Sequence, residues 1–129
     1  MAIQQPGFSI GFLKIPSTAF STKQHTVVVA QSCQGFVAAP SCSASMLGVM
    51  QDAPTVAGEA VNVMTEGVTK VKFQVSIAAG LNYIVGTSGM IASTGSAAAG
   101  ASVYGPVLFN PGTTGAIGSV LLKSVGVTT

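Results

Sequence analysis

The chain has 129 residues and a mass of 12.8 kDa, which corresponds to one ordinary domain and excludes a multidomain enzyme. Hydrophobic residues make up 48% of the sequence and charged residues only 6%, with a formal net charge of +2. Because disorder requires low hydrophobicity or high net charge, this composition predicts a folded protein.

The scarcity of charge also bears on the surface of the folded chain. A monomer of this mass exposes roughly 6,300 Å² to water by the usual scaling. Five lysines and three acidic residues are all the charged side chains that can cover this area. We therefore infer that other subunits cover part of the surface in an assembly.

Neither nucleic acid nor a membrane is an expected partner. Nucleic-acid binding requires clustered basic residues, whereas the lysines here are scattered at Lys14, Lys23, Lys70, Lys72 and Lys123. Glycine, asparagine and proline interrupt the uncharged stretch between Lys72 and Lys123, so it contains no run of about 18 apolar residues. The N-terminus has no secretory signal pattern, and we expect the protein to stay in the cytoplasm in which it is made until it joins an assembly.

Residues 1–45 lack a regular rhythm of strands and turns, since prolines and glycines interrupt them at Pro6, Gly7, Gly11 and Pro16. We expect an extended N-terminal arm that includes the first strand or strands, followed by a β-domain over residues 46–129. Large apolar side chains on an arm are costly unless they dock on a neighbour. The candidates for such an interface are Phe8, Ile10, Phe12, Ile15 and Phe20. The alternative is that these side chains pack on the chain's own core.

The remaining sequence favours short strands separated by turns. Valine outnumbers leucine by 17 to 6, and there are 16 glycines. The run 26–30 predicts a strand buried on both faces. Val61 and Val63 alternate with Asn62, and a longer alternation places four apolar residues inward, at Val71, Phe73, Val75 and Ile77. These patterns predict an all-β fold, a small β-barrel or sandwich of short antiparallel strands.

The sequence also resembles itself at a shift of 57 residues. At this shift Gly48, Pro54, Gly58 and Val63 align with Gly105, Pro111, Gly115 and Val120. Each segment then reads as a strand, a proline-containing turn, a glycine turn and a second strand. The pattern predicts two similar hairpins in one small domain.

Few residues could carry chemistry. The single histidine, His25, lies beside a predicted strand and no nucleophile motif surrounds it, so we expect no catalytic activity. Asp52, Glu59 and Glu66 recur at intervals of seven residues, and the first two occupy turn positions where carboxylates accept backbone N–H bonds. Cys33 and Cys42 are either two free thiols or a loop-closing disulfide. We expect no metal site and no cofactor.

Several segments in the second part of the chain carry a family resemblance. They are residues 47–54 (LGVMQDAP), 57–63 (AGEAVNV) and 66–71 (EGVTKV), then 78–80 (AAG) with Tyr83, the turn from Gly86 to Gly89, and 118–122 (GSVLL). In this order they resemble the capsid cement or decoration proteins of tailed bacteriophages, over about residues 47–122. The Phe-containing segment that precedes the match is longer than the usual start of that family.

This resemblance implies an all-β protein that binds the outer surface of an icosahedral head, on the virion. The implied partners are a major capsid protein of the HK97-like fold and other copies of the same chain, commonly as a trimer. Many copies would bridge adjacent capsomers and raise the barrier to rupture of the shell. Two other functions remain open: a tail or fibre structural module, and a carbohydrate-binding β-module on the virion surface. The latter favours exposed Trp or Tyr, and the chain has no Trp and two Tyr.

Overall fold

A computed structural model describes residues 7–16, 18–30, 37–38, 40–97 and 99–127 of the chain. These residues form eleven strands and three short 3-10 turns, and none of them is α-helical. The strands are β1 (Phe8–Lys14), β2 (Val27–Ala30), β3 (Val37–Ala38), β4 (Gly48–Met50), β5 (Ala60–Lys72), β6 (Tyr83–Val85), β7 (Ile91–Ser93), β8 (Ser102–Tyr104), β9 (Val107–Phe109), β10 (Ile117–Leu122) and β11 (Ser124–Val127). The 3-10 turns are η1 (Thr18–Thr22), η2 (Thr87–Gly89) and η3 (Thr94–Ser96). No helix within the described ranges has the length and apolar character needed to cross a membrane.

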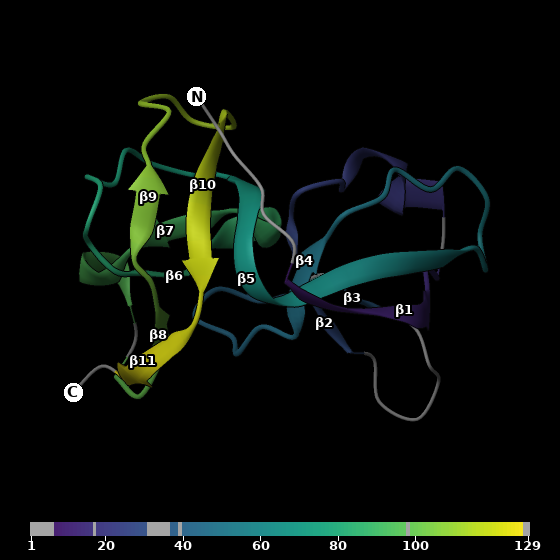
Figure 1. Cartoon of the computed structure of the whole chain (residues 1–129), viewed down its shortest axis with the longest axis horizontal. Helices are drawn as coiled ribbons and strands as arrows, with labels where there is room; N and C mark the ends of the chain where they lie inside the picture. The colour runs from purple at the N-terminus through teal and green to yellow at the C-terminus, as the bar shows by residue number, and fades with distance from the viewer. Residues whose placement is uncertain (1–6, 17, 31–36, 39, 98, 128–129) are drawn as a thin grey trace.

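The strands form two antiparallel sheets. The larger sheet has the order β3-β2-β4-β5-β10-β9, with β1 also paired to β5, and the smaller has the order β11-β8-β6-β7. Figure 1 shows the long strand β5 running from the end of the molecule that contains β1 to β4 to the middle, where it lies beside β10, with β6 to β11 on the other side. Neither sheet closes on itself, so the all-β fold expected from the sequence is sandwich-like.

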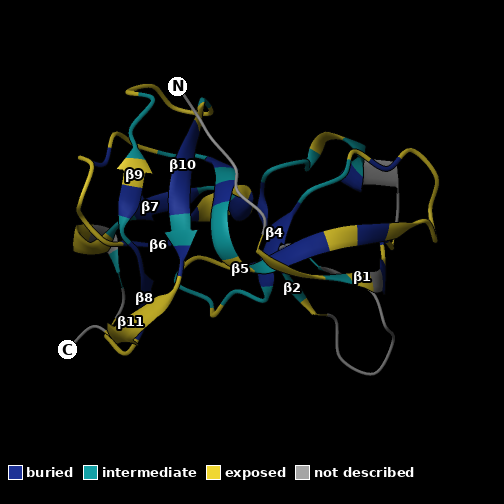
Figure 2. Cartoon of the chain, in the orientation of Figure 1, coloured by how far each residue is buried: buried dark blue, intermediate teal, exposed yellow. Residues whose placement is uncertain are grey.

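The buried side chains form a central core and a second core. The central core lies between the two sheets and includes Phe73, Tyr83 and Ile91, none of which is exposed. The second core lies against the half of the larger sheet that contains β1 and β4, and includes Ile15, Met50 and further apolar residues of β1, β2 and β5. Figure 2 shows that β5 carries buried residues along its whole length, so this one strand contributes to both cores.

The predicted strand 26–30 is confirmed as β2. Val27 packs in the central core and Val28 in the second core, which is the burial on both faces that its apolar run predicts. The strand becomes more exposed towards its end, because Val29 is half-buried and Ala30 is exposed.

The alternation within β5 is confirmed in most of its length. Val61 and Val63 are buried on either side of the exposed Asn62, and Val71 and Phe73 are fully buried. The prediction that Val75 points inward is wrong, since its side chain is exposed. The reason is that β5 ends at Lys72 and the backbone bends at residues 74–75. Ile77, the last of the four predicted residues, is buried as predicted.

The prediction of two similar hairpins is confirmed. Strands β4 and β5 pair Met50 with Val63, and β9 and β10 pair Val107 with Val120, which are the same positions displaced by 57 residues. The turns also agree, because Gly58 and Gly115 both adopt positive φ, +86° and +80°. No atom lies within 4 Å of a Cβ at either glycine, so the backbone conformation and not crowding favours glycine there.

The strands within residues 1–45 belong to the larger sheet. Strand β1 pairs with the first half of β5, and β2 pairs with β4. The whole chain exposes 6060 Å², close to the area expected for a compact monomer of this mass. The segment expected to be an arm therefore contributes strands that pack against residues of the β-domain.

Candidate interaction surface

The five residues predicted to form an interface lie in different environments. Ile15 and Phe20 are buried in the second core, and Ile10 is half-buried and packs against it. For these three the structure agrees with the alternative that they pack on the chain's own core. The backbone of Phe12 lies in β1, but its side chain is outside the described residues. Phe8 is the only one of the five that is shown exposed, with 63% of its surface accessible.

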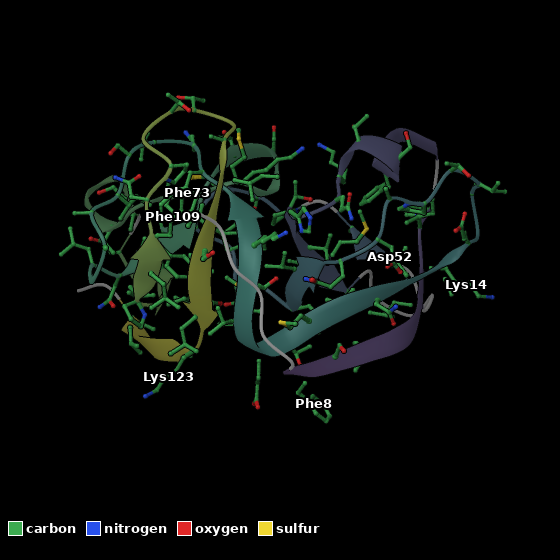
Figure 3. All side chains as sticks on the ribbon, turned by 45° about the horizontal axis from the view of Figure 1, so that its top comes forward. Phe8, Lys14, Asp52, Phe73, Phe109 and Lys123 are labelled. Carbon is green, nitrogen blue, oxygen red and sulfur yellow. The ribbon has the colours of Figure 1, made fainter. Side chains whose placement is uncertain are left out.

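Phe8 is held at the start of β1 by contacts with β5. It lies opposite Glu66 in the antiparallel register, and its carbonyl oxygen accepts a hydrogen bond of 3.1 Å from Thr65 Oγ1. The neighbouring backbones approach so closely that a Cβ at Gly7 would collide with the Glu66 carbonyl oxygen. In Figure 3 the Phe8 ring projects away from the ribbon at the lower edge of the molecule.

A groove of about 500 Å³ lies beside Phe8. Its apolar lining comes from three separate parts of the chain, at Met46, Leu47, Tyr104, Leu121 and Leu122, and its polar lining is Thr65, Glu66, Lys123 and Ser124. The Tyr104 hydroxyl accepts a 2.9 Å hydrogen bond from the Met46 backbone N–H, which fixes two sides of the groove relative to each other. No sequence motif predicts this groove, because its lining residues lie far apart in the chain.

The polar part of the groove contains both signs of charge. Glu66 and Lys123 are exposed, and within the part of the chain that the structure describes neither forms an ion pair. Lys123 joins β10 to β11, and Figure 3 shows its side chain directed outward along the same lower edge as Phe8. The groove therefore presents an apolar lining with one acidic and one basic group at its margin.

Next to the groove, β11 is the edge strand of the smaller sheet. All four of its residues are exposed, including Val125 and Val127, and it pairs on one side with β8. An exposed apolar edge strand without charge is a site at which another strand can add.

His25 has a structural environment. Its backbone N–H donates to the Met50 carbonyl at 2.8 Å, and its carbonyl accepts from the Lys72 N–H at 2.9 Å, which joins the connection between η1 and β2 to β4 and β5. The imidazole Nδ1 is buried without a hydrogen-bond partner among the described residues. Burial lowers the pKa of His25 below its ordinary value, and the positive charges of Lys70 and Lys72 lower this pKa further.

The predicted turn role is confirmed for Glu59, whereas Asp52 accepts a backbone N–H from a residue ten positions later, in β5. Asp52 Oδ2 accepts the Asn62 N–H at 2.8 Å, and Glu59 Oε1 accepts the N–H groups of Thr55 and Val56 at 3.2 and 3.3 Å. Both therefore stabilise the connection between β4 and β5. Within the described ranges, no three His, Cys, Asp or Glu side chains come together in a group that could hold a metal ion.

Of the two cysteines, Cys42 lies within the described residues. Cys42 is an exposed free thiol, and its Sγ lies 3.9 Å from Ser43 Oγ. Cys33 lies outside the described residues.

Comparisons with known proteins add no relative. The chain matches no protein-family model, and it shows no significant likeness to a curated protein or to a solved structure. The expectation of a capsid cement protein therefore continues to depend on the sequence motifs and on the surface described above.

Proposed function

We propose that this protein is a structural component of a phage particle, which binds the outer surface of the icosahedral head and stabilises it by bridging capsomers. The observation that carries this proposal is the balance of exposed side chains. Among the described residues the large exposed apolar side chains are as numerous as all the charged residues of the chain: Phe8, Val56, Val75, Leu81, Leu108, Ile117, Val125 and Val127.

A surface of this kind suits permanent association. Apolar area buried between proteins stabilises a contact without dependence on salt, whereas exposed charge pairs are screened. A small contact repeated over many copies stabilises a closed shell even if each copy adds little, because rupture of the shell must break many contacts together. The antiparallel sheets and two apolar cores give each copy a defined shape with which to bridge its neighbours.

The structure gives no support to the carbohydrate-binding alternative. Sugar recognition by stacking needs an accessible aromatic face. Tyr83 and Tyr104 are both buried and stack on each other, with ring centroids 6.0 Å apart. The tail or fibre alternative differs from head decoration in copy number, which is large for a head protein and small for a tail module.

The proposal is tested by mixing the purified protein with undecorated phage heads. We expect saturable co-sedimentation at a constant ratio of protein to capsid subunit and a higher temperature of head rupture. Binding should persist at high salt, because the contact is apolar. Heads saturated beforehand with the unlabelled protein are the control and should retain little labelled protein. Absence of binding and of any rise in the rupture temperature would contradict the proposal.

A charge variant provides a matched control for the type of contact. Lys14 is exposed at the end of β1. If binding to heads is apolar, Lys14→Ala should leave both the ratio and the rupture temperature unchanged. A strong loss in this variant, together with loss of binding at high salt, would indicate an electrostatic contact and overturn the apolar mechanism.

A further inference from the structure

A projecting apolar side chain and an apolar groove lie next to each other on this molecule. Phe8 is paired with Glu66 and accepts a hydrogen bond from Thr65, and both of these residues line the groove. Phe8 is 63% exposed and is not among the residues that line the groove, so it does not fill the groove of its own molecule. Phe8 is therefore an exposed aromatic residue whose backbone contacts two residues of the groove, and its side chain leaves the groove unfilled.

We propose that the groove receives Phe8 from a second copy of this chain. The groove, of about 500 Å³, has room for a phenyl ring, and its lining of Leu121, Leu122, Met46 and the Tyr104 ring is apolar. A fully enclosed aromatic side chain buries about 150–250 Å². Because 63% of Phe8 is exposed, docking in the groove removes at most roughly two thirds of that area. Buried aromatic anchors of this kind dominate the affinity of many protein interfaces.

The charges at the groove favour a second copy over a partner of one charge sign. Glu66 and Lys123 both line the groove and carry opposite charges, and neither has an ion-pair partner among the described residues. Two copies that face each other with their grooves can bring Glu66 of one copy to Lys123 of the other. Exposed pairs of this kind add little affinity but select the orientation of the contact.

This contact is separate from head binding. Self-association through Phe8 requires only purified protein, whereas the proposed function requires a capsid. A protein that stays monomeric yet binds heads would overturn the self-contact and leave the proposed function intact. A protein that self-associates through Phe8 but does not bind heads would overturn the proposed function and leave the self-contact intact.

The test is sedimentation equilibrium of the full chain with three single variants. Phe8→Ser removes the projecting ring, and Ser124→Trp fills the groove from an exposed position. Val56→Ser is the matched control, because Val56 is also 63% exposed but lies in the β4–β5 connection, at the opposite end of the molecule from β11 in Figure 1. Thermal unfolding of each variant checks that it is folded.

We expect the unmodified protein to associate with increasing concentration. Phe8→Ser and Ser124→Trp should each raise the dissociation constant roughly tenfold or more, while Val56→Ser changes it by less than about twofold. A monomer at every accessible concentration, or equal losses in Phe8→Ser and Val56→Ser, would overturn the proposal.

The orientation of the contact is tested by charge exchange. Glu66→Lys and Lys123→Glu should each weaken association, because each variant places like charges together across the contact. The double variant restores the opposite charges and should recover most of the association of the unmodified protein. If both single variants weaken association and the double variant does not restore it, Glu66 of one copy does not face Lys123 of the other.

Discussion

The β4–β5 hairpin and the β9–β10 hairpin share the pairing of Met50 with Val63 and of Val107 with Val120, and a glycine turn at positive φ. They differ in a register shift beside Val120 and in their surroundings. In each, the residue that directly follows a strand paired with the hairpin is bound to the turn by two backbone hydrogen bonds. Ile15 accepts from Gly58 N–H and donates to Glu59 O, and Phe73 accepts from Gly115 N–H and donates to Ala116 O. The first hairpin closes the second core, and the second hairpin belongs to the central core between the sheets. Similar local sequence thus specifies the turn, while the rest of the chain determines how deeply it is buried.

Each hairpin and the core that it packs against form one unit, and strand β5 belongs to both units. Its first half is the second strand of the first hairpin, and its second half pairs with β10 as β1 pairs with the first half. Lys14 lies opposite Ala60, and Lys72 lies opposite Ile117, which is 57 residues after Ala60. The second half of β5 therefore has the role towards the second hairpin that β1 has towards the first.

The largest expected difference between the units is at Phe73 and Ile15. Phe73→Ala leaves a cavity in the central core and should lower the free energy of unfolding by about 3–5 kcal/mol. Ile15→Ala empties a smaller side chain from the smaller second core and should cost about 2–4 kcal/mol. Urea denaturation of both variants measures this order. A larger loss at Ile15 than at Phe73 would contradict the dominance of the central core.

The next effect concerns two buried hydroxyls that also lie 57 residues apart. Tyr83 donates a 2.9 Å hydrogen bond to the Leu121 carbonyl and joins the two sheets, whereas Thr26 donates at 2.6 Å to the nearby Lys23 carbonyl. Tyr83→Phe should cost about 1–3 kcal/mol, because it leaves a buried acceptor without its partner. Thr26→Val should cost less, about 1 kcal/mol, since its bond is local. Thermal denaturation compares the stability of the two variants. Equal losses of stability would contradict a contribution of the Tyr83 hydroxyl to the contact between the sheets.

A smaller and equal effect is expected at the two hairpin turns. Gly58→Ala and Gly115→Ala each place a Cβ in a left-handed backbone conformation, which costs about 1–2 kcal/mol, and neither Cβ meets another atom. The two variants should therefore lose stability by the same amount within experimental error. Free energies of unfolding from denaturant titrations that differ by more than about 1 kcal/mol would show that the turns are not equivalent.

The smallest expected effect is a dependence of the free energy of unfolding on pH, which comes from His25 beside β4 and β5. Because the pKa of His25 is lowered in the folded protein, the unfolded chain, with a pKa near 6.5, binds a proton that the folded chain does not. Stability should therefore fall as the pH is lowered from about 7 to about 5. His25→Gln should reduce this slope, as measured by denaturation at several pH values. An unchanged slope would assign the dependence to other groups.

Some parts of this structure follow from local sequence and others do not. The alternation of Val61 and Val63, the double-faced burial of β2 and the glycines of the two turns are local properties, and each was predictable. The pairing of β1 with β5 and the burial of Ile15 depend on contacts between distant segments. For the same reason the groove beside Phe8, which joins segments from residue 46 to residue 124, carries no signal in any single stretch of sequence.

The most direct test of the functional account is an electron-microscopy reconstruction of phage heads after incubation with this protein. We expect density that fits two packed antiparallel sheets at fixed positions outside the shell, with each copy in contact with more than one capsomer. Heads with a bare outer surface, or density found only on the tail, would contradict the account.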